Sequence, residues 1–364
     1  MFDPRCWILD TRKSNNEHRE SRIEYQDRLR PKEANLTMKT LLIPFSFLYY
    51  AVISIRNFFY KIGVFRSYRL DAKVISVGNI TWGGTGKTPA AAFIANLLFG
   101  RGLKPAILLR GYGDDEELLY SKLAPAIPVV AGKDRVETGK AILASRSVKT
   151  ILLDDGFQYR RLKRDLDIVC IDATDPFGNG WVIPAGSMRE GLSSLKRADV
   201  FLITKVDLAQ DKNGLKELEK RLKKINPGAA ILKSSHSPQY FYRLSDNKII
   251  NGAKLKNNSI ALVSAIGNPD AFEKTILSLG LKFKKHFIFR DHHWYKEGDL
   301  KRIGNYCAKN KIDTIITTEK DAVRLGQGTR DKGQGTNILV LRVQLEITEN
   351  EQGFYNRLSG ICTG

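Results

Sequence analysis

The stretch Val74-Ile-Ser-Val-Gly-Asn-Ile-Thr-Trp-Gly-Gly-Thr-Gly-Lys-Thr-Pro89 decides the fold of this chain of 364 residues. An apolar, β-branched run enters a glycine-rich turn, and a helix is expected to begin near Lys87. Backbone amides in a turn and at a helix N-terminus together favour the binding of an anion. Glycines let the backbone come close to phosphate oxygens. Pro89 falls in the first helical turn, where its missing N–H costs nothing. The pattern predicts a phosphate-binding loop.

Within this loop the residue types have separate chemical roles. Lys87 is expected to neutralise the β- and γ-phosphates of a nucleoside triphosphate, and the Thr88 hydroxyl to bind Mg²⁺. Thr81 stands where the motif usually has its first glycine, but three further glycines follow it. We therefore expect the nucleotide to contact Thr81, Trp82, Gly83, Gly84, Thr85, Gly86, Lys87 and Thr88.

On both sides of the loop the chain alternates short apolar runs with helical stretches. Several of these runs are continuously apolar, as is typical of parallel strands that are covered on both faces. The alternation predicts an α/β fold with a doubly wound, mostly parallel sheet of the P-loop NTPase type. The expected strands span residues 74–77, 106–109, 127–130, 150–153, 167–171, 200–203, 260–263 and 314–317.

The chain divides into four regions by composition. Residues 1–37 have mixed charge and little apolar periodicity, and Met38 follows them, so they are either a disordered extension or a wrongly assigned start. Residues 63–235 are expected to form the P-loop core, with 336–364 returning to it. Residues 236–335 are expected to form a smaller α/β domain, in which the Gly- and Gln-rich run from 326 predicts a flexible surface loop.

The remaining region, residues 38–62, is centred on a run of 16 uncharged residues at 40–55. A helix that spans a bilayer needs roughly 20 apolar residues, so this run is short. No small-residue cleavage site follows it, as a signal peptide would require. Aromatic residues edged by Lys39 and Arg56 are typical of an interfacial helix that attracts acidic lipids. We expect a membrane-associated helix; the alternative is a helix buried against its own domain.

The charge balance indicates an anionic partner. Lys and Arg total 59 against 39 Asp and Glu, giving a net charge of +20, and 42% of the residues are apolar. A nucleic acid, a lipid surface or a phosphorylated substrate would fit such a charge. The four cysteines lie far apart without a CxxC pair, which argues against a disulfide scaffold or a zinc site and fits a reducing compartment.

A second motif supplies the acids that a phosphate-binding loop needs. The apolar run at 150–153 ends in Asp154 and Asp155 and continues Gly156-Phe-Gln158. A carboxylate at the end of a strand near the loop can orient Mg²⁺ and its waters. The sequence therefore predicts a metal site at this strand end.

Seven motifs stand in the order expected of one family. They are the loop at 74–89, Arg110-Gly-Tyr-Gly113, Gly132-Lys-Asp-Arg135, Asp154-Asp-Gly-Phe-Gln158, Met188-Arg-Glu190, Asp291-His-His293 and Thr317-Thr-Glu-Lys-Asp-Ala-Val-Arg324. Over residues 38–345 the chain resembles tetraacyldisaccharide 4'-kinases, the lipid A kinases of Gram-negative bacteria. The resemblance implies transfer of the ATP γ-phosphate, with Mg²⁺, to the 4'-hydroxyl of tetraacyldisaccharide 1-phosphate, forming lipid IVA. The resemblance also implies that the enzyme acts at the cytoplasmic face of the inner membrane.

The resemblance also implies roles for individual residues. Asp154 and Asp155 match the pair that organises Mg²⁺. Arg189 and Glu190 match an Arg-Glu pair near the nucleotide and the metal, so Glu190 is expected at the metal. Asp115, which is followed by a Glu, matches the family's general base. His292 matches the histidine that orients this base. Asp114 as the base and His293 as the partner remain alternatives in the motif register.

Two other functional classes compete with this interpretation. Thr204-Lys-Val-Asp207 followed later by Ser264-Ala265 resembles the guanine-reading elements of a GTPase, but no D-x-x-G motif follows a strand at suitable spacing. A basic nucleic-acid-binding module would also explain the charge, but no zinc finger, RNP-type strand or helix-turn-helix pattern is present. We expect a monomer with no nucleic-acid partner, whose partners are the acylated disaccharide and acidic lipids.

Overall fold

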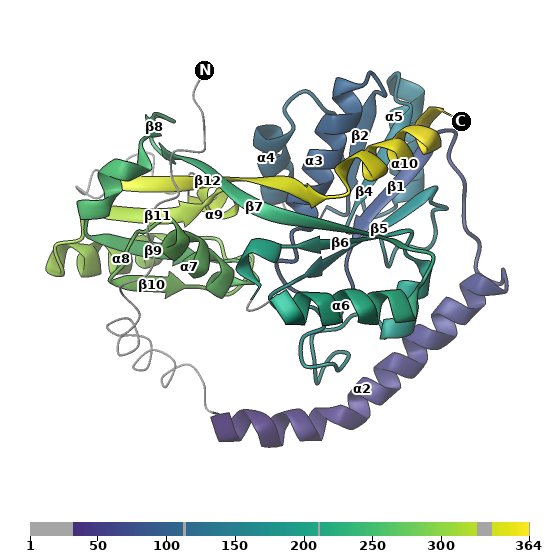
Figure 1. Ribbon diagram of the computed structural model, residues 1–364, viewed down its shortest axis with the longest axis horizontal. Helices are drawn as coiled ribbons and strands as arrows, with labels where there is room; N and C mark the ends of the chain where they lie inside the picture. The colour runs from purple at the N-terminus through teal and green to yellow at the C-terminus, as the bar shows by residue number, and fades with distance from the viewer. Residues whose placement is uncertain (1–31, 112–113, 210–211, 326–336, 364) are drawn as a thin grey trace.

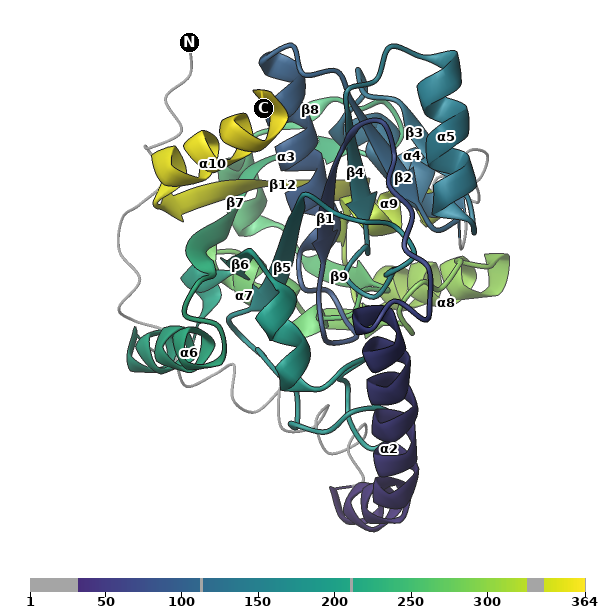
Figure 2. The same cartoon turned by 90° about the vertical axis from the view of Figure 1, so that its right-hand side faces the viewer.

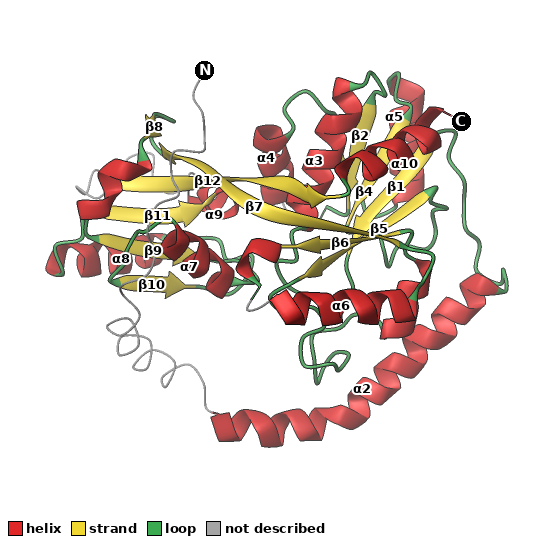
Figure 3. Ribbon diagram, viewed as in Figure 1, coloured by secondary structure: helices red, strands yellow, loops and turns green. Residues whose placement is uncertain are grey.

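The computed structural model describes residues 32–111, 114–209, 212–325 and 337–363. Within these ranges the chain builds one 12-stranded sheet with helices on its faces (Figure 1; Figure 3). The strand order is β10-β9-β11-β12-β7-β6-β5-β1-β4-β2-β3, with β8 paired to β7. Neighbouring strands are parallel except for β7 with β12 and β7 with β8. The predicted doubly wound, mostly parallel α/β fold is confirmed.

The elements have the following bounds. The strands are β1 (Lys73–Gly78), β2 (Pro105–Leu109), β3 (Val129–Ala131), β4 (Thr150–Asp154), β5 (Leu166–Asp172), β6 (Val200–Thr204), β7 (Ala230–Arg243), β8 (Ile249–Ile250), β9 (Ile260–Ser264), β10 (Lys285–Ile288), β11 (Thr314–Thr318) and β12 (Asn337–Glu349). The helices are α2 (Lys32–Lys61), α3 (Lys87–Gly100), α4 (Asp114–Leu123), α5 (Arg135–Ser145), α6 (Lys212–Ile225), α7 (Pro269–Ser278), α8 (Glu297–Lys309), α9 (Glu319–Leu325) and α10 (Glu351–Thr363). Short 3₁₀ helices span Leu192–Arg197, Val206–Leu208 and Gly252–Asn257.

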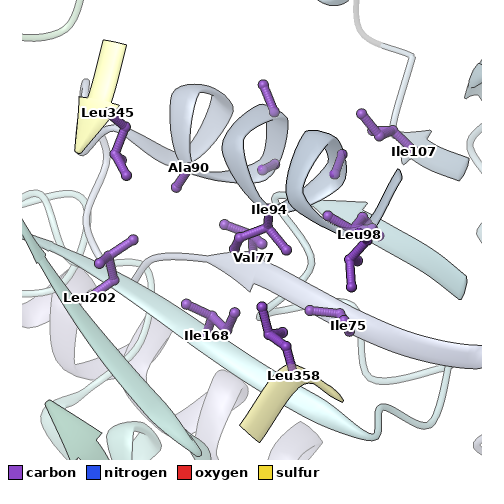
Figure 4. Packing of buried hydrophobic residues seen from close by; sticks show 14 of the residues in the cluster. Ile75, Val77, Ala90, Ile94, Leu98, Ile107, Ile168, Leu202, Leu345 and Leu358 are labelled. Carbon is purple, nitrogen blue, oxygen red and sulfur yellow. The ribbon is translucent and has the colours of Figure 1, made fainter. Parts of the chain in front are cut away.

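Strand β1 is mostly apolar because both of its faces are buried, with Ser76 as its one buried polar side chain. Ile75 and Val77 belong to the cluster under α3, whereas Val74 belongs to a separate cluster on the other face of the sheet. Figure 4 shows Ile75 and Val77 beneath the side chains of Ile94 and Leu98 from α3. This packing fixes where β1 ends and α3 begins, and it therefore fixes the loop between them.

Strands β7 and β12 join the two halves of the sheet. They pair with each other over most of their length, while β7 also pairs with β6 and β12 pairs with β11. The C-terminal helix α10 then returns to the cluster under α3, where Figure 4 places Leu345 and Leu358. The boundary expected at 235/236 falls inside β7, so this strand continues from one half into the other.

All eight predicted strands are present, but four observed strands were not predicted. The unpredicted strands are only partly buried, or buried on alternate residues, so their sequences lack a continuous apolar run; they are β7, β8, β10 and β12. The expected loop at 326–336 lies outside the described residues, as do residues 1–31 of the expected N-terminal extension.

Helix α2 begins at Lys32, earlier than the predicted start at residue 38. It stands beside the sheet and points away from it at its N-terminal end (Figure 2). Most of its apolar side chains face solvent, with Leu41 68% and Leu48 64% exposed. The alternative of a helix buried against its own domain is therefore wrong. Among the described residues α2 is the one helix long and apolar enough to cross a membrane, judged by length and composition.

Candidate active site

A cavity of about 1020 Å³ lies beside the carboxyl ends of β1 and β4. One wall comes from the phosphate-binding loop, α3 and α4, and the other from residues 266–275, 290–294 and 318–320. In open α/β sheets, ligands bind at the carboxyl ends of the strands where the strand order reverses. The strands that follow β1 in the chain lie on both of its sides, so the cavity occupies such a position.

The loop between β1 and α3 has the conformation of an anion-binding turn. Gly83 and Gly86 have φ angles of 121° and 82°, which favour glycine. No side chain caps the N-terminus of α3, and no acid lies in its first turn, so the first amides of the helix face the cavity without a competing carboxylate. Asn79 and Thr204 hold Thr85 in place through hydrogen bonds of 2.8 and 2.9 Å.

Lys205 stabilises the conformation of the phosphate-binding loop. Its Nζ donates to the carbonyl of Gly84 at 2.6 Å and pairs with the buried carboxylate of Asp172. On another side Gly267 packs so closely that a Cβ added there would lie 2.4 Å from the Gly84 nitrogen. Lys205 was part of the pattern that resembled a guanine-reading motif, and here its contacts are with the loop backbone.

Asp154 lies beside the loop because β4 pairs with β1 in a register that sets Val77 opposite Asp154. Its Oδ2 accepts hydrogen bonds from Thr88 Oγ1 at 3.3 Å and from Tyr120 OH at 2.8 Å. Burial raises the pKa of Asp154, although Lys87 acts in the opposite direction. A divalent cation would therefore compete with a proton at this carboxylate.

The surroundings of Asp155 lower its pKa, whereas those of Asp154 raise the pKa of that residue. Arg189 Nη1 donates to both of its oxygens, at 2.8 and 2.7 Å, and Lys87 Nζ lies 3.7 Å from Oδ1. Burial would raise the pKa of Asp155, but Lys87 and Arg189 outweigh it and lower the pKa to about 2. Asp155 is therefore ionised at neutral pH, and its charge is already matched by two cations.

The oxygens of Thr88 and Asp154 fit a Mg²⁺ site. Mg²⁺ usually binds through one or two protein carboxylates and keeps several waters beside the phosphates of its substrate. No group of three or more His, Cys, Asp and Glu side chains suited to a metal occurs among the residues that the structure describes. The donor set thus suits a metal that is shared with a nucleotide rather than one held by the protein alone.

Asp115, in the first turn of α4, lines the cavity and is held there by Arg324 of α9. The fully buried Arg324 donates to Asp115 Oδ2 from Nε at 3.0 Å and from Nη2 at 2.6 Å. His292 Nδ1 lies 3.3 Å from the same oxygen. Burial would raise the pKa of Asp115, but the hydrogen bonds with His292 and Arg324 hold it well below its usual range. The carboxylate is ionised at neutral pH. The side chain of Asp114 lies outside what the structure describes.

His292 lies between cations as well as beside Asp115. Its Nδ1 lies 3.3 Å from Asp115 Oδ2 and 3.1 Å from Arg324 Nη2, and its Nε2 lies 3.1 Å from the ammonium of Lys320. These contacts fix the orientation of the ring beside the carboxylate. The neighbouring His293 instead contacts Asp299 at 2.8 Å and stacks on Phe289. Between the two candidate histidines, His292 is the one that the fold places beside Asp115.

Glu116 also lines the cavity, next to the expected base. Burial and the charges of Asp154 and Asp115 raise its pKa to about 7. Sequence reasoning used this residue only as part of the motif that identifies Asp115. Its proximity to Asp154 could not be deduced from the sequence, because α4 and β4 meet only in the fold.

Glu190 is not where the sequence led us to expect it. Its carboxylate is 1% exposed and pairs with Arg56 at 3.2 Å and Arg197 at 2.9 Å, on the side of α2. It does not line the cavity, so the expected metal role is not carried forward. The other expected nucleotide contacts, Trp82 to Thr88 and Arg189, do line the cavity, whereas Thr81 is buried and pairs with Met188.

Besides Glu116, three residues at this site were not assigned a role from sequence: Arg324, Lys320 and Tyr120. Arg324 and Lys320 lie in a motif that was used for resemblance, but nothing in their spacing shows that they face Asp115 and His292. Tyr120 lies one turn beyond Glu116 in an apolar stretch of α4, and it resembles an ordinary core residue in sequence. Its hydroxyl contact with Asp154 depends on how α4 packs on the sheet.

A phosphate-binding loop, a strand-end carboxylate beside its Thr and a histidine-oriented carboxylate across the same cavity define the class: a P-loop phosphotransferase. The family model described as tetraacyldisaccharide-1-P 4'-kinase matches residues 38–362. The chain belongs to the tetraacyldisaccharide 4'-kinase family. It is therefore a kinase that phosphorylates the 4' position of a tetraacyldisaccharide 1-phosphate, and the GTPase alternative is set aside.

Relatives of known name support the assignment over nearly the whole chain. The tetraacyldisaccharide 4'-kinase of Bdellovibrio bacteriovorus is 34% identical over 90% of this chain and 99% of its own length. That of Syntrophus aciditrophicus is 34% identical over 81% of this chain and 86% of its own length. The crystal structure of LpxK from Aquifex aeolicus in complex with ATP has 28% identity and a TM-score of 0.66, covering 89% of this chain and 99% of that one.

Proposed function

We propose that the cavity binds MgATP and the sugar end of the acylated disaccharide together, and that the residues described above transfer the γ-phosphate between them. The observation that carries this proposal is that the loop, Asp154 and the Asp115–His292 pair line one cavity. The free amides at the start of α3 and Lys87 would bind the phosphates. Thr88 and Asp154 would hold Mg²⁺, which supplies neutralisation of charge on the transferred group.

Asp115 is proposed to accept the proton of the 4'-hydroxyl. All contacts of this carboxylate found within the described residues are made by Oδ2, which leaves Oδ1 to face a substrate hydroxyl. A carboxylate of low pKa is a weak base toward a free alcohol. In phosphoryl transfer, however, the hydroxyl becomes acidic as the P–O bond forms, so a well-oriented and permanently ionised carboxylate suffices. His292 and Arg324 would fix its direction.

Arg189 and Asp155 are proposed to complete the phosphate end of the site. Asp155 is held by Arg189 more closely than by Lys87. This arrangement would give Asp155 a closer partner than Lys87, so that the Lys87 ammonium can turn to phosphate oxygens without leaving Asp155 unpaired. Arg189 also lies near the exposed ring of Trp82, with 5.9 Å between its guanidinium carbon and the ring centre. The two side chains form the rim of the cavity next to the loop.

Helix α2 is proposed to hold the enzyme at the membrane that contains its acylated substrate, at the cytoplasmic face. Support comes from the exposed apolar side chains along α2 and from Lys61 in its last turn. Apolar area and basic residues act together in binding to an acidic bilayer. The net charge of +20 has the sign that such a surface favours. We propose that the enzyme acts there as a monomer.

The proposed reaction is tested by incubating the detergent-solubilised protein with [γ-³²P]ATP, Mg²⁺ and the disaccharide 1-phosphate. We expect a labelled lipid with two phosphates, one at each end of the disaccharide. The matched control is Lys87→Ala, which removes the cation of the loop and should abolish transfer. Labelling that persists at full rate in Lys87→Ala would contradict the roles proposed for the loop, and efficient replacement of ATP by GTP would contradict the choice of nucleotide.

A further inference from the structure

Residues 181–191, called the bridging segment here, run along the phosphate-binding loop. The amide of Trp82 donates to the carbonyl of Ser187 at 2.7 Å, and the amide of Arg189 donates to the carbonyl of Ile80 at 2.7 Å. Backbone bonds on both sides of the loop's first residues tie the two stretches together. A shift of the bridging segment would therefore displace the phosphate-binding loop as well.

The opposite side of the bridging segment is bound to α2. The fully buried Ser46 donates from Oγ to the carbonyl of Val182 and accepts from the amide of Ala185, both at 2.9 Å. One turn further along α2, the Tyr49 hydroxyl donates to the carbonyl of Arg189 at 3.0 Å. These are specific polar contacts, which attraction to a membrane does not require.

A charged contact between α2 and the bridging segment is the one to Glu190. Arg56 Nη2 donates to Oε1 at 3.2 Å, and Asn57 Nδ2 donates to Oε2 at 3.1 Å. Arg197 Nη2 reaches the same Oε2 at 2.9 Å. Because Glu190 is almost completely buried, undocking of α2 would remove two of the three side chains that satisfy its carboxylate and leave Arg197, which is unfavourable. Burial of Glu190 therefore favours the docked position of α2.

The neighbouring side chains of the bridging segment point to different places. Glu190 faces α2, while Arg189 makes its two short bonds to Asp155 at the cavity. With Arg189 in place, Asp155 has a closer partner than Lys87, at 2.7 Å against 3.7 Å. With Arg189 displaced, Lys87 would become the main counter-ion of Asp155 and would be drawn away from phosphate.

We propose that docking of α2 positions Arg189 on Asp155, so that Arg56, Tyr49 and Glu190 are positioning residues for phosphoryl transfer and α2 is part of the catalytic framework as well as a membrane helix. The inference rests on the proposed function, because it assigns a role to Arg189 in that reaction. It also gives Glu190 a role that does not involve metal binding.

The test compares Arg56→Met and Arg56→Lys with Lys220→Met, a control that removes a cation from an exposed ion pair on α6. Turnover is measured in detergent, and binding to phosphatidylglycerol vesicles is measured by co-sedimentation. We expect Arg56→Met to lower kcat by up to about 10²-fold, the cost of a displacement of about 1 Å at a reacting centre. We also expect it to raise the Mg²⁺ concentration for half-maximal rate and to leave vesicle binding unchanged. Arg56→Lys should recover most of the loss.

Tyr49→Phe provides a second variant that keeps the packing and removes only the bond to Arg189. It should lower kcat in the same direction without a loss of melting temperature. Wild-type turnover in the same assay tests the proposed function separately. Wild-type kcat in both Arg56→Met and Tyr49→Phe would overturn the inference. A raised Mg²⁺ requirement in Glu190→Gln that is absent from Arg56→Met would also overturn it, because Glu190 would then act on the metal directly. A double variant Arg56→Met/Glu190→Gln no slower than either single variant would support it.

Discussion

His292 Nδ1 lies 3.3 Å from Asp115 Oδ2 across a separation of 177 residues. The two residues come from opposite walls of the cavity, so the pair exists only when the two halves of the sheet are packed together. Arg324 and Lys320, both from α9, hold this pair from behind. The candidate base is therefore assembled by three segments that are remote in sequence.

Replacement of Asp115 by Asn should lower kcat by about 10²-fold or more, the usual contribution of a positioned base. The amide keeps the shape of the side chain but cannot accept the proton of the hydroxyl. The measurement is kcat under saturating ATP and disaccharide, with Asp114→Asn as the matched control. If Asp114→Asn is the damaging change and Asp115→Asn is not, the assignment of the base is wrong.

Mg²⁺ should bind more weakly as the pH falls, because burial raises the pKa of Asp154 and a proton then competes for its oxygens. Titration of activity with Mg²⁺ at several pH values would show the concentration for half-maximal rate rising toward low pH. In Asp154→Asn this pH dependence should largely disappear, and much more Mg²⁺ should be needed at every pH. An unchanged Mg²⁺ requirement in Asp154→Asn would place the metal elsewhere.

Glu116 should make the nucleotide-free protein less stable as the pH rises. Its pKa of about 7 in the folded protein lies above the usual value for a glutamic acid, so the folded state holds a proton that the unfolded state has released. This contribution is present in full below the unfolded pKa of about 4.3 and is lost as the pH rises through about 7.

Glu116→Gln should remove that penalty. Melting temperatures measured in EDTA at pH 5 and pH 8 should show the variant gaining on the wild type by a few degrees at the higher pH. Glu117→Gln, the neighbouring acid on α4, is the control and should show no such gain. A difference between wild type and Glu116→Gln that does not change with pH would contradict the raised pKa.

Substitution of Leu41, Phe45 and Leu48 by serine should move the protein from the membrane fraction to the soluble fraction. These side chains are 68%, 60% and 64% exposed on α2, and their apolar area is what a bilayer would cover. Ile249→Ser is the control, since this residue is 64% exposed on β8. Fractionation of cells expressing each variant measures the share of protein in the membrane and soluble fractions. An unchanged distribution of the triple variant would count against α2 as the membrane helix.

Continuous burial explains which strands could be predicted. β1, β4, β5 and β6 are buried on both faces, so their sequences are predominantly apolar. β7 and β12 pair with each other in antiparallel fashion and are partly exposed where they connect the two halves, so their sequences mix polar and apolar residues and were not predicted as strands. The same exposure explains why a boundary was expected in the middle of β7.

Local chemistry explains which site residues could be predicted. The loop residues, Thr88 and Asp154 were identified because their roles depend on short-range spacing after a strand. Glu190 was placed at the metal by resemblance, but the structure turns its side chain toward α2, where two arginines satisfy its charge. A partner 134 positions away cannot be recognised from the residues around Glu190.

The sequence by itself determined the phosphate-binding loop, the parallel strands around it, the family and the apolar character of α2, because each depends on residues close together in the chain. Only the tertiary structure decided that His292 faces Asp115, that Lys205 braces the loop and that Arg56 holds Glu190. These are pairings of charged or polar groups across long separations. Their energy depends on distance and burial in the folded state, and sequence spacing carries neither quantity.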